Sequence, residues 1–134
     1  MSQRDIPEIR DAEAELRRAE ACFPSYESAA MFKDAFEALD DFTETTSPSD
    51  EVVRFVDNLK FSYTRIIVTR LNEIETKDFD KYISYAIILL LRMQPTLNKL
   101  TATKPEITVL LNECKQRFLP QVEELVRRFQ PSGI

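Results

Sequence analysis

The sequence contains no histidine and no tryptophan, and it has one glycine and two cysteines among 134 residues. Without histidine the chain cannot form a Ser-His-Asp triad, a Cys-His pair or a His-ligated zinc site. Its single glycine, Gly133, excludes the glycine-rich loops that bind phosphate in Walker and dinucleotide-binding motifs. These absences remove the most familiar classes of active site.

Long hydrophobic runs are also missing. The most apolar stretch, 82–93, is shorter than the roughly 20 residues that a membrane-spanning helix needs. The first residues, 1–5, run into charged sequence without the apolar segment of a secretory signal. Cys22 and Cys114 lie within apolar helical patterns, where we expect reduced thiols rather than a disulfide. The sequence therefore predicts a cytoplasmic protein with no membrane span.

What the chain does contain is typical of a folded domain. Hydrophobic residues make up 43% and charged residues 31% of the sequence. This balance and this length favour one globular domain, which we predict to cover residues 1–134.

Apolar residues recur at spacings of three and four along most of the chain, which is the pattern of amphipathic helices, and we find no strand pattern. The predicted helices are 6–23, 25–43, 48–75, 77–101 and 104–130, with a tail at 131–134. We expect an all-α, antiparallel, up-and-down helical bundle of five helices, or four if Pro24 only kinks the first two. The apolar residues that recur in this way along one helix form a stripe. The stripes around Pro95 and Pro120 keep the same spacing on both sides of the proline, so we expect kinks in the long helices there rather than helix ends.

The stripes predict which side chains form the core. In the first two helices they are Ile6, Ile9, Ala12, Leu16, Ala19, Phe23, Ala29, Phe32, Phe36, Leu39 and Phe42. In the third they are Val52, Val56, Leu59, Tyr63, Ile66 and Ile74, with Arg70 as the one charged residue on that stripe. The fourth helix contributes Phe79, Ile83, Ala86, Leu90, Met93, Leu97 and Leu100. The last helix contributes Ile107, Leu111, Cys114, Phe118, Val122, Leu125 and Phe129.

Three residues stand where helix caps are expected. Asp5 and Thr103 each precede a glutamate by three residues, which is the spacing of a capping box. Ser47 precedes a proline at the expected first position of the third helix. We predict that these residues cap the first, fifth and third helices.

Charge is unevenly distributed. Residues 1–51 contain fourteen acidic and five basic residues, a net charge of −9, whereas residues 52–134 contain nine acidic and thirteen basic residues, a net charge of +4. The two halves either dock against each other within one molecule or present charged faces to a partner. The candidate binding residues for a basic partner lie on one side of the second helix: Asp34, Glu37, Asp41 and Glu44.

Two arginines are candidates for an anionic ligand. Arg70 lies on an apolar stripe and Arg92 at the end of an apolar run, so each must find a partner or reach solvent. Tyr63, Tyr82 and Tyr85 are candidates to line a pocket with them. The simpler interpretation is that both arginines reach the edge of the bundle and pair with nearby acids.

These observations favour a non-catalytic protein–protein interaction module, such as a regulator, an adaptor or a neutralising partner, that binds another protein or a second copy of itself. We expect no cofactor and no metal. Nucleic acid is a poor candidate because the basic residues of the second half are dispersed among acids and the isoelectric point is near 4.9.

The alternative function is magnesium-dependent nucleotide hydrolysis. All-α hydrolases of this kind hold magnesium with carboxylates from neighbouring helices. Two Glu-x-x-Asp pairs, Glu8 with Asp11 and Glu37 with Asp40, lie in the acidic N-terminal helices. This hypothesis requires that the carboxylates converge.

Overall fold

The structure, a computed structural model, describes residues 3–74 and 79–129. These residues form a short 3-10 helix and five α-helices, without a strand. The elements are η1 (Gln3–Asp5), α1 (Pro7–Ala21), α2 (Tyr26–Thr46), α3 (Asp50–Asn72), α4 (Phe79–Thr103) and α5 (Glu106–Phe129). The predicted all-α helical bundle is confirmed, with Pro24 between two separate helices. The ends predicted at 75, 77 and 130 and the tail at 131–134 lie outside the described residues.

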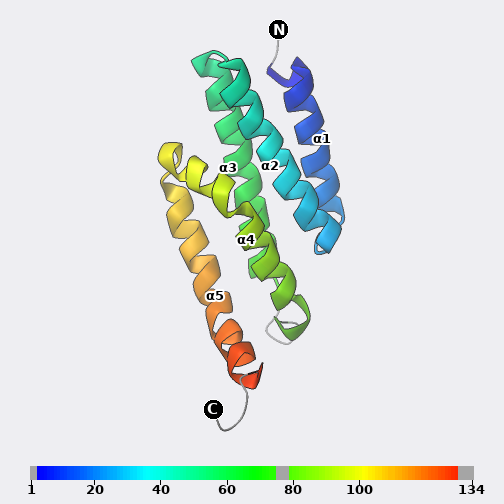
Figure 1. The fold of residues 1–134 in the computed structure, drawn as a ribbon, viewed down its shortest axis with the longest axis vertical. Coiled ribbons are helices and arrows are strands. Elements are labelled where there is room, and N and C mark those ends of the chain that lie inside the picture. Colours follow the sequence, from blue (N-terminus) through cyan, green and yellow to red (C-terminus); the bar gives the residue numbers. More distant parts are fainter. Residues whose placement is uncertain (1–2, 75–78, 130–134) are drawn as a thin grey trace.

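The helices pack in an order that differs from their order along the chain. The main contacts join α1 to α2, α2 to α4, α4 to α5 and α3 to α5 (Figure 1). Consecutive helices α2 and α3 touch only slightly. The up-and-down order therefore stays a prediction. Within the described residues, no helix is long and apolar enough to cross a membrane.

The two interior prolines do not end their helices. Pro95 lies inside α4 and Pro120 lies inside α5. Figure 1 shows that α4 changes direction along its length. Both helices therefore continue past their proline, as the unchanged apolar spacing predicts. The kinks expected at these two residues stay predictions.

The core contains most of the predicted stripe residues. In α1, α2 and α5 these side chains are buried as predicted: Ile9, Ala12, Leu16, Ala19, Ala29, Phe32, Phe36, Leu39, Phe42, Ile107, Leu111, Cys114 and Phe118. In α4 the buried ones are Met93, Leu97 and Leu100. Ile6, Phe23 and Leu90 are only partly buried. The predicted side chains of Phe79, Ile83, Ala86, Val122, Leu125 and Phe129 lie outside the described part. The prediction is correct for the buried residues because an α-helix has 3.6 residues per turn, which places apolar residues three and four apart on one face.

The buried face of α3 differs in part from the predicted one. Val56, Tyr63 and Ile74 are buried as predicted, whereas Val52, Leu59 and Ile66 are only partly buried. Lys60, Ile67 and Leu71 are buried although they were not predicted. Ile67 and Leu71 follow Lys60 by seven and eleven positions, so the three residues lie on the same side of the helix.

Two of the predicted caps are displaced by local structure. Asp5 ends η1, and the N-cap of α1 is Ile6, whose side chain makes no capping hydrogen bond. Ser47 ends α2 in a left-handed conformation with φ 46°, so it cannot begin α3. Ser49 caps α3 instead, its Oγ accepting from the backbone N–H of Val52 at 3.4 Å.

Three threonines extend α2 to Thr46, beyond the predicted end at 43. The hydroxyls of Thr43, Thr45 and Thr46 donate to the backbone carbonyls of Asp40, Asp41 and Phe42 respectively, at 2.6 to 2.9 Å. Because the three hydroxyls find their hydrogen-bond acceptors within α2, these polar residues can remain helical.

The third predicted cap, Thr103, is the last residue of α4 rather than the first cap of α5. Its hydroxyl donates to the carbonyl of Leu100 at 3.2 Å, within the helix that it ends. Helix α5 then begins at Glu106. A capping-box spacing alone therefore placed the start of α5 two residues too early.

A buried hydroxyl pair connects three helices. The Ser28 hydroxyl donates to the carbonyl of Ala19 at 2.8 Å and lies 3.2 Å from the Tyr85 hydroxyl. Because serine has one hydroxyl proton, Tyr85 is the donor in the second bond. Burial raises the pKa of Tyr85 to about 12, so the phenol stays protonated and the α1–α2–α4 contact persists across the neutral range.

Arg117 connects α5 to the end of α3. Its guanidinium donates to the carbonyl of Leu71 at 2.7 Å and also to the carbonyl of Ile74. The last carbonyls of a helix have no partner in the helix and carry its partial negative charge. A cation on α5 thus caps α3 and fixes how the two helices meet.

We expect Arg117→Met to lower the free energy of unfolding by about 2 kcal/mol, because two charge-assisted hydrogen bonds to carbonyls are lost. Urea denaturation measures this change. Lys115→Met, an exposed position on the same helix, is the matched control and should change stability by less than about 0.5 kcal/mol. Equal effects of the two substitutions would show that Arg117 does not cap α3.

Candidate functional site

The acidic residues of α2 that were predicted to bind a basic partner lie on its outer face, but part of their charge is neutralised. Lys33 lies between Asp34, at 3.8 Å, and Glu37, at 3.0 Å. Both carboxylates are about half exposed. Such exposed pairs contribute little to stability, about 0.3–0.5 kcal/mol for the i,i+4 pair.

The other half of this acidic face reaches the basic half of the chain. Glu44 accepts a hydrogen bond from Lys99 of α4 at 2.6 Å, and this bond raises the pKa of the Lys99 ammonium. Asp41 is exposed beside them. The charge asymmetry of the sequence is thus used, at this point, for docking within one molecule.

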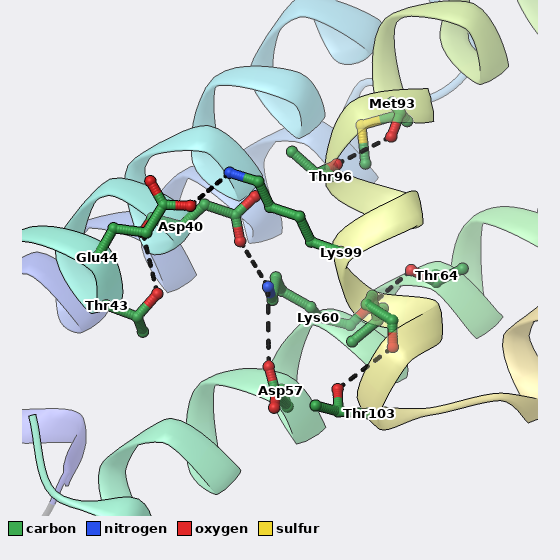
Figure 2. A network of polar contacts seen from close by, with 11 residues as sticks. Asp40, Thr43, Glu44, Asp57, Lys60, Thr64, Met93, Thr96, Lys99 and Thr103 are labelled. Carbon is green, nitrogen blue, oxygen red and sulfur yellow. Dashed lines mark hydrogen bonds and ion pairs between the residues drawn. The ribbon is translucent and has the colours of Figure 1, made fainter. Parts of the chain in front are cut away.

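A second ion pair between the halves is buried. The Lys60 ammonium of α3 donates to Asp40 of α2 at 2.6 Å, and each side chain is only 5% exposed. Asp57 lies 3.8 Å from the same ammonium (Figure 2). Lys60 therefore lies between two carboxylates where α2, α3 and α4 meet.

One oxygen of this buried pair has no partner. Among the described residues, Asp40 Oδ2 is the buried side-chain oxygen without a hydrogen bond. Burial raises the pKa of Asp40 above its ordinary value of 3.8, although the bond from Lys60 opposes that shift. Burial and the bond from Lys60 therefore act in opposite directions on this carboxyl group, and burial has the larger effect.

The carboxylates of the magnesium hypothesis do not converge. Glu37 pairs with Lys33 outside, Asp40 is buried against Lys60, and Asp11 is exposed beside Arg10. In the part of the chain that the structure describes, no group of three or more Cys, Asp or Glu side chains is placed to hold a metal ion. The hypothesis therefore has no metal site in residues 3–74 and 79–129.

Of the two predicted arginines, Arg70 lies near one of the proposed pocket tyrosines, because its guanidinium and the Tyr85 ring both contact the Phe23 ring. Arg92 is exposed, and Arg70 lies at the edge of the bundle with its guanidinium carbon 4.9 Å from the centre of the Phe23 ring. Tyr85 and Tyr63 are buried, and the side chain of Tyr82 lies outside the described part. The partner of Arg70 is an aromatic face, which the search for nearby acids missed.

Cys114 shows no sign of a reactive thiol. It is fully buried, and burial raises its pKa to about 11. A thiol with this pKa is protonated at neutral pH, and it is therefore a poor nucleophile.

Several hollows open on the surface of the described residues, and three of them bear on function. One of about 590 Å³ lies beside the buried pair and is lined by Asp50, Val53, Arg54, Asp57, Asn58, Thr103 and Lys104. A second, of about 470 Å³, is lined by Glu20, Ser62, Arg65, Ile66, Thr69 and Arg70. The sequence does not predict either hollow, because each one combines residues of α3 with residues from a distant part of the chain.

The third hollow, which we call the α4–α5 groove, has a volume of about 290 Å³ and an almost wholly apolar lining. Its residues are Ile87, Leu90, Leu91, Gln94, Lys115, Phe118 and Leu119. Leu91 is 68% exposed and Leu119 is 50% exposed. They are two of only four large hydrophobic side chains that are exposed in the described residues, and both lie on this groove.

Comparisons with known proteins do not add a family to this picture. No protein-family model, no curated protein and no solved structure matches the chain. The function must therefore be inferred from the geometry of these sites.

We expect the Asp40–Lys60 pair to show strong coupling in a double-mutant cycle. Lys60→Met leaves the buried carboxylate of Asp40 without its partner and should cost about 3–5 kcal/mol. Asp40→Ala leaves Lys60 with only the more distant carboxylate of Asp57 and should cost less, and the double variant should recover about 2–3 kcal/mol of the loss caused by Lys60→Met. Urea denaturation of the four proteins measures the coupling. The exposed pair Glu44 and Lys99 is the control, and its coupling should be far smaller than that of the buried pair because water screens both charges. Equal coupling in both cycles would contradict the importance of burial.

Asp40 should also give the unfolding free energy a defined pH dependence. Because its pKa is raised in the folded state, the carboxyl stabilises the fold fully below pH 3.8, and this contribution is lost as pH rises through the raised pKa. Comparison of Asp40→Asn with the native sequence by urea denaturation from pH 3 to pH 7 isolates that contribution. The advantage of the native sequence over the variant should fall with rising pH, and a rising advantage would show that the pKa is lowered instead.

Proposed function

We propose that this protein is a non-catalytic protein–protein interaction module and that the α4–α5 groove binds its partner. The observation that carries the proposal is the exposure of Leu91 and Leu119 on opposite walls of an apolar hollow. Exposed leucines are common singly, but their convergence on one concave apolar surface is typical of an interaction site.

The shape of the groove suits a helical partner. It lies between two helices, and its lining includes the buried Phe118 and the partly buried Leu90. Amphipathic helices bind such grooves by inserting apolar side chains spaced three or four residues apart. One or two such side chains match a hollow of about 290 Å³.

Charge favours an acidic partner over a second copy. Lys115 lines the groove and Arg92 follows Leu91 directly, and neither forms an ion pair with another described residue. Residues 79–129 contain eight basic and five acidic residues. A two-fold contact through this face would bring like charges together, whereas an acidic amphipathic helix would complement them. We therefore propose an acidic helix of another protein as the partner.

The proposal also includes a cytoplasmic location and no cofactor. Support for the location comes from Cys22 and Cys114, which are both unpaired thiols, as is usual in a reducing compartment. The acidic face of α2 remains a second candidate contact, and its ion pairs with Lys33 and Lys99 make it the weaker one.

A helical-peptide library tests the groove. Peptides with an apolar stripe and randomised polar positions are selected for binding to the native protein and are then measured against two variants. We expect Leu91→Ser/Leu119→Ser to weaken the selected peptides at least about tenfold, since burying one leucine contributes about 1.5–3 kcal/mol. Val109→Ser removes an equally exposed apolar side chain of α5 outside the groove and should leave binding unchanged.

The remaining outcomes are equally informative. Peptides that bind both variants as well as the native protein would refute the groove as the site. Selection of neutral or basic peptides would overturn the acidic partner while keeping the groove. A concentration-dependent dimer in sedimentation, abolished by the double serine variant, would assign the groove to a second copy of the chain.

A further inference from the structure

The second hollow has a separate character from the α4–α5 groove. It lies where the last turn of α1 meets the exposed face of α3, and five of its six lining residues are polar or charged. Its volume of about 470 Å³ falls within the range of small-molecule sites. Two guanidinium groups, Arg65 and Arg70, open into it.

Aromatic rings hold both guanidinium groups in place. The Arg70 guanidinium carbon lies 4.9 Å from the centre of the Phe23 ring, and that of Arg65 lies 5.9 Å from the centre of the Phe61 ring. A guanidinium over an aromatic face is attracted to it through its flat surface, which leaves the N–H groups at its edge available. The arginines are therefore partly ordered before any ligand binds.

The two arginines lack a carboxylate partner. Across the residues that the structure describes, no acidic side chain lies within ion-pair distance of Arg65 or Arg70. Helix α3 contains no acidic residue from 58 to 72. The Lys104 ammonium lies 5.8 Å from the centre of the same Phe61 ring, but it lines a different hollow. The local charge is thus positive in a protein whose net charge is −5.

The remaining polar residues of the hollow are two hydroxyl residues and one glutamate. Ser62 and Thr69 bring hydroxyls from the same face of α3, and within the described part neither hydroxyl forms a hydrogen bond. Glu20 of α1 is the one acid in the lining. Two guanidinium groups and two hydroxyl groups together offer many hydrogen-bond donors. They match the three terminal oxygens of a phosphate group better than the two oxygens of a carboxylate.

We propose that the hollow between Arg65 and Arg70 binds the phosphate group of a small phosphomonoester. The two guanidinium groups and the hydroxyls of Ser62 and Thr69 donate to the phosphate oxygens. Glu20 accepts a hydrogen bond from a hydroxyl of the organic part, such as that of a sugar. Because Glu20 repels a polyanion, a small ester fits this site better than a nucleic-acid strand. The site is independent of the α4–α5 groove.

NMR titration of the full chain tests the proposal. The probes are ribose 5-phosphate, adenosine monophosphate and inorganic phosphate, with adenosine as the phosphate-free control. The two esters should shift the side-chain Nε–Hε signals of Arg65 and Arg70 and the amide signals of Ser62 and Thr69, and adenosine should not. Saturable shifts with the esters support the site, and the absence of shifts at millimolar ester overturns it.

Conservative variants separate a geometric site from diffuse attraction. Arg65→Lys and Arg70→Lys retain the charge but lose the forked donor, and each should weaken ester binding about tenfold. Arg54→Lys, at an exposed position of α3 outside the hollow, is the control and should bind normally. Unchanged affinity in all three variants would overturn the site. A native-like amide spectrum of each variant shows that its fold is retained.

The probes also distinguish the source of the phosphate. Tighter binding of the esters than of inorganic phosphate supports the role of Glu20, and Glu20→Gln should then abolish the difference between them. Equal binding of all three phosphates retains the phosphate site and overturns the part assigned to Glu20.

Discussion

The buried contact between Lys60 and Asp40 is the constraint on which the arrangement of the helices depends. A lysine and an aspartate that are each 5% exposed must meet, because either charge alone in this environment would be strongly unfavourable. Their contact fixes α2 against α3 at this point, and Ile67 and Leu71, on the same side of α3 as Lys60, are buried with it.

The burial of Lys60 also determines which residues lie on the exposed face of α3. With Lys60 inside, Ser62, Arg65 and Thr69 lie on the exposed face, and Arg70 reaches the ring of Phe23 at the edge. The hollow that we assign to a phosphomonoester is therefore a consequence of the buried pair. The α4–α5 groove has a different origin, because α4 is apolar on more sides than its neighbours cover and Leu91 remains exposed.

The sequence was sufficient for the helices and for most of the core, and insufficient for the sites. Periodicity identified five helices and the buried faces of α1, α2 and α5, since both depend on neighbours along the chain. The caps were displaced because Ser47, Asp5 and Thr103 had competing local partners that spacing does not reveal. A signal for the buried pair was present, since Lys60 follows Val56 by four residues and Asp40 follows Phe36 by four, on the apolar faces. It was missed because a charge on such a face was assumed to reach solvent.

The sequence by itself determined that this protein is a helical bundle without histidine chemistry or a glycine-rich phosphate loop, because composition and periodicity are local properties. It also determined the excess of acid in the first half and of base in the second. Only the tertiary structure decided which of these charges meet, because Asp40 and Glu44 find Lys60 and Lys99 across 20 and 55 residues of chain. It alone decided which leucines and arginines are left without a partner in the described residues, since that depends on how completely one helix covers another.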